Sequence, residues 1–152
     1  MLNRGYARAQ SGNLVGAITD YDECLQLNPK NAEAYCYRGC ARKEQGDIKA
    51  ALADFKQAIP VKLNYADAYL KRGIVRLEQG DLMRAMTSFD RALTIDHTLA
   101  QAFLRRGIAL RLSGKEEQSR MDFAQWRKLD ENLKSVLEKR IEEVTKKSTV
   151  AT

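Results

Sequence analysis

The chain has 152 residues, of which 44% are hydrophobic and 30% charged, and its formal net charge is +6. This suits one globular domain with a packed core, and no apolar run approaches the ~20 residues of a membrane span. The first residues lack the charged head and apolar stretch of a secretory signal, and an odd number of cysteines does not suit a secreted disulfide framework. We therefore expect a cytoplasmic protein that does not insert into a membrane.

The hydrophobic pattern predicts nine helices and no strand. In chain order they span 2–11, 14–27, 31–45, 48–59, 65–79, 82–95, 99–113, 116–129 and 131–147. Pro60 should end or kink the fourth of these, because proline cannot donate the helical hydrogen bond. The ninth carries apolar residues at helical spacing and is expected to cap the array with that face. A flexible tail, 148–152, should follow.

Two columns of glycines repeat at a step of 34 residues, which indicates a stacked repeat architecture. The first column is Gly5, Gly39, Gly73 and Gly107, and the second is Gly12, Gly46, Gly80 and Gly114. The first lies in mid-helix, where glycine costs roughly 1 kcal/mol relative to alanine, so a neighbour should pack too closely for a side chain. The second precedes a helix-capping residue type in three of its four positions and should form a tight turn.

Further columns keep the same step and fill the space between the glycines. A small-residue column reads Ala17, Ala51, Ala85 and Ser119, and an aromatic column reads Tyr21, Phe55, Phe89 and Phe123. The unit is therefore a helix, a tight turn and a second helix. Neither helix can bury its apolar stripe alone, so successive pairs must stack.

These columns resemble the tetratricopeptide repeat family. The second repeat carries the pattern as Tyr35, Arg38-Gly39, Gly46-Asp47, Ala51, Phe55 and Ala58. The resemblance implies an all-α fold, a right-handed superhelical array of antiparallel helix pairs (an α-solenoid). It implies a single domain over 1–147, with repeats at about 1–31, 32–65, 66–99 and 100–133 and a capping helix at 131–147.

Arginine stands before each mid-helix glycine, where the family usually has leucine. Sixteen residues after each arginine, on the helix packed against it, stands Asp20, Asp54, Ser88 or Asp122. We predict that Arg4, Arg38 and Arg106 pair with the three aspartates. Ser88 would leave Arg72 without a carboxylate.

The resemblance also implies a concave groove, lined by the first helix of each repeat, that binds a peptide or helix of a partner protein. The groove residues expected from it are Leu2, Tyr6, Cys36, Cys40, Leu70, Ile74, Leu77, Leu104, Ile108 and Leu112. An exposed apolar strip of this kind normally marks a binding surface. The alternative is a self-assembling structural module, a homo-oligomer in which another copy fills the groove or the open first repeat.

No catalytic constellation is found, and no cofactor or metal is expected. His97 is the only histidine and falls in a turn, without a nucleophile or orienting partner nearby in the pattern. Cys36 and Cys40 share a helix face, but a zinc site would need two further ligands, so they are interpreted as small apolar lining.

Two specific ligands are also disfavoured. Residues 101–152 carry 12 basic against 8 acidic residues. We interpret this bias as a solubilising surface rather than a nucleic-acid site, because no aromatic platform accompanies it. The family's carboxylate clamp for chaperone tails keeps only one required charge in either register, Lys71 or Arg105, so capture of such tails is not expected.

Overall fold

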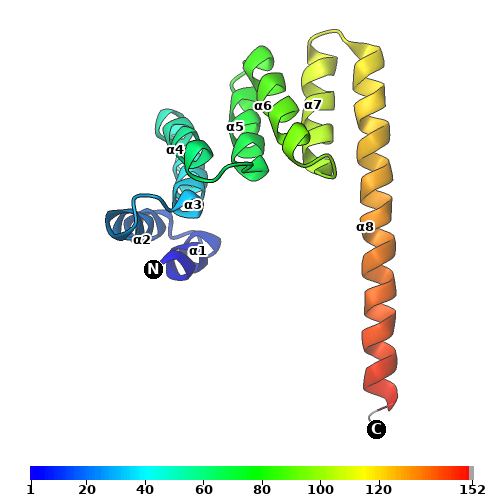
Figure 1. Ribbon diagram of the computed structural model, residues 1–152, viewed down its shortest axis with the longest axis horizontal. Coiled ribbons are helices and arrows are strands. Elements are labelled where there is room, and N and C mark those ends of the chain that lie inside the picture. The colour runs from blue at the N-terminus through cyan, green and yellow to red at the C-terminus, as the bar shows by residue number, and fades with distance from the viewer. Residues whose placement is uncertain (151–152) are drawn as a thin grey trace.

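The computed structural model describes the backbone of residues 1–150, which forms eight α-helices and no strand. The helices are α1 (Leu2–Gln10), α2 (Leu14–Leu27), α3 (Ala32–Glu44), α4 (Ile48–Val61), α5 (Ala66–Glu78), α6 (Leu82–Ile95), α7 (Ala100–Leu112) and α8 (Glu116–Val150). Each odd-numbered helix packs against the even-numbered helix that follows it, and successive pairs stack side by side (Figure 1). The all-helical repeat array expected from the sequence is confirmed.

The first seven helices begin and end within a residue or two of their predicted bounds. Pro60 lies in the last turn of α4, which ends one residue later at Val61. Proline has no backbone N–H to donate to the carbonyl four residues earlier, so it weakens this last turn, and the helix ends one residue later. The helix therefore ends close to Pro60, although not before it.

The predicted break before a separate ninth helix is wrong. Helix α8 continues without interruption from Glu116 to Val150, runs back alongside α7 and extends well past the beginning of α7 (Figure 1). The physical reason is that neither glycine nor proline occurs in this stretch, so nothing in the backbone stops the helix. The predicted tail is helical as far as Val150, and 151–152 lie outside the described residues.

Each helix pair is closed by a turn whose glycine adopts a left-handed conformation. Gly46 and Gly80 have φ values of +86° and +76°, which side-chain-bearing residues rarely adopt. The next residue then caps the second helix: the side chain of Asp47 accepts a hydrogen bond from the Ala50 amide, and that of Asp81 accepts one from Arg84. Such caps stabilise a helix by about 1 kcal/mol each.

The mid-helix glycines allow an aromatic ring of the second helix to approach the first-helix backbone. A Cβ atom built on Gly39 would lie 2.8 Å from the Phe55 ring, and one on Gly73 would lie 2.5 Å from the Phe89 ring. Gly5 and Gly107 meet Tyr21 and Phe123 in the same way. The sequence predicted a close neighbour here, and the structure identifies it as the aromatic column.

The predicted arginine–aspartate pairs are confirmed in all three repeats. Arg4 lies 2.6 Å from Asp20 between Nη2 and Oδ1. In the second and fourth repeats the pair is two-pronged, with Nε and Nη2 donating to Asp54 at 3.0 and 2.6 Å and to Asp122 at 2.7 and 2.8 Å. These aspartates are buried, so the pairs belong to the packing between the two helices.

We predict that Gly73→Ala destabilises the fold because the new methyl group would displace the Phe89 ring. Overpacking costs about 1–3 kcal/mol and exceeds the roughly 1 kcal/mol gained in helix propensity, so the free energy of unfolding should fall. Urea denaturation measures this. In a Phe89→Leu background the same substitution should cost less, and an equal cost in both backgrounds would contradict the assignment.

We also predict that Asp20 titrates below its ordinary pKa of 3.8, because hydrogen bonding from Arg4 and the charges of Arg4 and Arg8 favour its ionised form. A carboxyl group whose folded-state pKa is lowered stabilises the protein above its unfolded-state pKa. That stability should disappear as the pH falls from about 4. An NMR titration of the Asp20 carboxyl measures the pKa, Asp20→Asn should flatten the acid limb of stability, and a pKa at or above 3.8 would contradict the pairing.

Candidate functional site

The first helices of the repeats lie on the inner side of the array. Each contacts the first helix of the next pair: α1 with α3, α3 with α5, and α5 with α7. Within the described chain, no such contact joins successive second helices. The array therefore curves with α1, α3, α5 and α7 on its concave side.

A hollow of about 530 Å³ opens on this concave side over the first three repeats. Its lining residues come chiefly from first helices and are Tyr6, Ala9, Gln10, Tyr21, Cys36, Tyr37, Cys40, Ala41, Glu44, Asp67 and Lys71. We call this hollow and the first-helix surface that continues from it to Leu112 the concave groove. Its size is within the usual range for sites that receive a small ligand or a few side chains of a peptide.

The ten groove residues predicted from the sequence are not equally accessible. Cys36, Leu70 and Ile74 are buried in the core between helix pairs, with Cys36 only 1% exposed. Leu2, Cys40, Leu77, Leu104 and Ile108 are half-buried, whereas Tyr6 and Leu112 are 48% and 64% exposed. The apolar strip is therefore not exposed along its whole length: Leu70 and Ile74 are covered where the next pair stacks, and Cys36 borders the hollow with little exposed surface.

Three tyrosines from two repeats form the wall of the hollow near the N-terminal end. The ring of Tyr37 lies between the others, with its centroid 5.5 Å from that of Tyr6 and 6.0 Å from that of Tyr21. Burial raises the pKa of Tyr21 to about 12, so its hydroxyl stays protonated at neutral pH. This arrangement leaves Tyr6 as an aromatic surface backed by two further rings, which suits contact with an apolar or proline-containing segment.

The two cysteines of α3 have pKa values shifted in opposite directions. The thiol of Cys36 donates to the carboxylate of Asp67 at 3.7 Å, and hydrogen bonding to Cys40 together with burial raises the pKa of Cys36. The same contact with Cys36 lowers the pKa of Cys40, and Lys71 adds to the effect. Among the described residues, no group of three potential metal ligands is present. Their surroundings match lining of the hollow, with Cys40 the more readily ionised thiol.

The middle of the groove carries both signs of charge. Glu44 and Asp67 line the hollow from α3 and α5, and Lys71 lies among them. The acidic Glu78 is already paired with Lys43 at 2.9 Å, which links neighbouring first helices. Acidic and basic groups of a partner would therefore meet different parts of the floor.

The sequence columns missed Tyr37 and Gln10 as groove residues. Tyr37 belongs to the column one residue before the arginines, which also holds Asn3, Lys71 and Arg105. Gln10 belongs to the column of Glu44, Glu78 and Leu112, two residues before the turn glycines. Both columns keep the 34-residue step, so the signal was present, but their residue types are too varied to be read as one surface.

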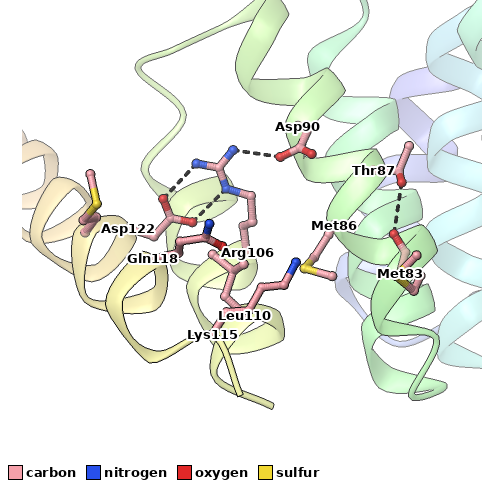
Figure 2. Close-up of a pocket in the computed structure, with 10 residues that line it drawn as sticks. Met83, Met86, Thr87, Asp90, Arg106, Leu110, Lys115, Gln118 and Asp122 are labelled. Atoms are coloured by element: carbon pink, nitrogen blue, oxygen red, sulfur yellow. Dashed lines mark hydrogen bonds and ion pairs between the residues drawn. The ribbon is translucent and has the colours of Figure 1, made fainter. Parts of the chain in front are cut away.

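A second hollow, of about 480 Å³, lies between second helices on the other side of the array (Figure 2). It is lined from α6, α7 and α8 by Met83, Met86, Thr87, Asp90, Arg106, Leu110, Lys115, Gln118, Met121 and Asp122. Figure 2 shows Arg106 between two carboxylates, donating to Asp90 from one side and to Asp122 from the other. The charge of the Arg106 guanidinium is therefore balanced by carboxylates of the same chain.

The chain belongs to the tetratricopeptide repeat family. A family model described as TPR repeat matches residues 5–46 and 39–80, and one described as Tetratricopeptide repeat matches 67–95. No curated protein sequence matches the chain.

Solved structures show the same fold. The crystal structure of MamA superposes with a TM-score of 0.81 at 25% sequence identity, over 88% of this chain and 78% of MamA. The Arabidopsis OM64 TPR domain gives 0.70 at 25% identity, over 72% of this chain and 91% of that domain. The first TPR of Spaghetti (RPAP3) bound to the HSP90 peptide SRMEEVD gives a TM-score of 0.71 at 20% identity, over 74% of this chain and 90% of that one.

In the described part of the chain, no helix combines the length and apolar character needed to cross a membrane. Although α8 is 35 residues long, charged side chains occur throughout it.

Proposed function

We propose that the chain is an interaction scaffold whose concave groove binds a peptide segment or a helix of a partner protein, without chemistry of its own. The observation that carries this proposal is the hollow on the inner side of the first three repeats, with Tyr6 at its edge and Glu44, Asp67 and Lys71 on its floor. A concave surface that combines apolar side chains with convergent polar groups is the usual form of a binding site. The repeat family and its peptide-bound neighbour support a ligand of this class.

Within this groove the accessible apolar residues are at its two ends. Tyr6 lies at the first repeat and Leu112 at the fourth, and between them Leu104 and Ile108 are half-buried. Interface energy concentrates in a few desolvated anchors, and aromatic residues are the most frequent among them. We infer that Tyr6 is the principal anchor of the guest, with Leu112 contacting its other end.

Self-assembly is the second candidate function, and one observation favours it. Every described residue of α8 from Glu131 onward is exposed, and α8 packs only against α7 within the described chain. This stretch presents Leu133, Leu137 and Ile141 at four-residue spacing, each more than half exposed. One face of the helix is therefore apolar and uncovered, so another copy is a candidate occupant.

We predict that the double variant Tyr6→Lys, Leu112→Lys stays folded but loses partner capture, because both side chains are exposed while both belong to the proposed groove. A principal anchor typically contributes more than about 2 kcal/mol, so recovery of the partner in affinity capture should fall by more than ~10-fold. Circular dichroism and melting temperature check the fold. Ile74 is unsuitable for this test because it is buried, and a lysine there would unfold the core.

The matched control is Val15→Lys, Met83→Lys, which places the same charges on apolar positions of the second helices that are 70% and 75% exposed. The control should capture the partner as the wild type does. If the control loses the partner while the groove variant keeps it, the second-helix face is the site. If the wild-type molar mass instead rises with concentration and α8 variants abolish the rise, self-assembly replaces the groove proposal.

A further inference from the structure

Three of the four arginines before the mid-helix glycines are held in one pose. Arg38, Arg72 and Arg106 each place their guanidinium over the aromatic ring three residues earlier, at 5.5, 5.1 and 5.6 Å from the centroid. The stacking ring is Tyr35, Tyr69 or Phe103. Arg72 therefore points its donors in the same direction as its two neighbours in the ladder.

In the neighbouring repeats, the donors of the corresponding arginine each meet one of two carboxylates. The Nε and Nη2 atoms of Arg38 donate to Asp54 on its own second helix, and Nη1 donates to Asp22 on the second helix of the preceding pair at 2.5 Å. Arg106 repeats this with Asp122 and, at 2.8 Å, with Asp90. Each of these two guanidinium groups therefore donates hydrogen bonds to carboxylates on two different second helices.

The third repeat has lost both carboxylates. Around Arg72, Ser88 stands at the position of Asp54 and Lys56 at the position of Asp22. The Ser88 side chain is too short to reach the guanidinium as a carboxylate does. Lys56 carries the same positive charge as Arg72. The Nε atom of Arg72 is buried and has no hydrogen-bond partner, and Arg72 makes no ion pair with any described residue. A half-buried cation in this state has only the Tyr69 ring to offset its desolvation cost, without the carboxylates that its neighbours have.

A second arginine adds to the same gap. Arg76, one turn after Arg72, donates to the Ser88 hydroxyl at 3.0 Å, where its counterpart Arg42 donates to the carboxylate of Asp54 at 2.8 Å. Burial lowers the pKa of both Arg72 and Arg76, and the charge of Arg76 lowers that of Arg72 further. By contrast, pairing with Asp122 raises the pKa of Arg106.

The charged residues at the positions around Arg72 are also mostly basic. The positions that line the hollow of Figure 2 have counterparts one repeat earlier, between α4 and α6, at a step of 34 residues. The charged residues at those counterparts are Lys49, Lys56, Arg72, Arg76, Asp81 and Arg84. Asp81 is engaged as the cap of α6 and as the partner of Arg84 at 3.4 Å. These counterpart positions therefore carry five basic residues and one acidic residue, whereas the hollow of Figure 2 is lined by two of each.

We propose that the gap between Arg72, Arg76 and Ser88 is an oxyanion-binding site that takes a carboxylate or phosphate group in place of the carboxylates of Asp54 and Asp22 in the preceding repeat. The oxyanion accepts from Nε and Nη2 of Arg72, as the aspartates of the other repeats do, and from Arg76, whereas the Ser88 hydroxyl already donates to the Arg84 carbonyl at 2.9 Å. Lys56 supplies charge at the entrance. The site lies among second helices, away from the concave groove, and does not rest on the groove's function.

The test compares the wild type with Ser88→Asp, which restores the carboxylate that the other repeats carry, and with the matched control Ser88→Ala. Inorganic phosphate and a short polyglutamate peptide are titrated separately by calorimetry at constant ionic strength. Wild type and Ser88→Ala should bind, whereas Ser88→Asp should bind at least ~10-fold more weakly, because the new carboxylate occupies the two arginines. Ser88→Asp should also melt at a higher temperature than the wild type without added ligand.

The two probes separate the sources of the oxyanion. Binding of phosphate that Ser88→Asp abolishes supports a free anion, and binding of polyglutamate alone with the same sensitivity supports an acidic side chain of a partner. A transplant of the site, Asp22→Lys with Asp54→Ser, should add a second equivalent of bound ligand at Arg38. If neither probe binds the wild type, or if Ser88→Asp binds both as tightly as the wild type does, the proposal is overturned.

Discussion

The approach of one aromatic ring to one glycine fixes the geometry of every helix pair. A Cβ atom at these glycines would lie 2.5 to 2.8 Å from the ring of the paired helix, so no other residue permits the same spacing without movement. Because the contact recurs at every repeat, the pairs are copies of one another and stack in register. The arginine beside each glycine then meets the residue sixteen positions later, and the first helices line one side of the array. The concave groove and the ion ladder are both consequences of this contact.

This dependence explains why much of the fold is predictable from the sequence. The glycine, aromatic and aspartate columns define contacts within one helix pair, and the 34-residue step shows that the next pair makes the same contacts. Arg38 and Asp54 were paired on that basis. The additional partners, Asp22 for Arg38 and Arg42 for Asp54, bridge other positions of the same ladder and needed the stacked structure to be seen.

The features that could not be predicted are those that the repeat pattern does not determine. Helix α8 continues beyond the last repeat because Leu129 to Glu131 contain nothing that stops a helix, although the repeats themselves end there. Burial of Cys36, Leu70 and Ile74 depends on how closely the next pair stacks, and column spacing does not contain that distance. Conversely, Tyr37 lines the groove from a column whose other members are polar or charged.

A repeated scaffold allows single repeats to differ without loss of the fold. Ser88 and Lys56 change the charge of one inter-repeat groove while the Gly73–Phe89 contact keeps the helices in place. Tyr6 and Tyr37 likewise give the concave side its aromatic character in the first two repeats only. The functional character of the chain therefore lies in the positions at which the repeats depart from one another.

The central claim, that a partner segment lies in the concave groove, is tested most directly by site-specific photo-crosslinking. A photoreactive phenylalanine analogue is placed at Tyr6 on the groove and, in a separate chain, at Val15 on the second-helix side, where both side chains are exposed. The account predicts a discrete crosslinked product at Tyr6, mapped by mass spectrometry to one segment of a different protein, and none at Val15. A product formed at Val15 and absent at Tyr6 would contradict it.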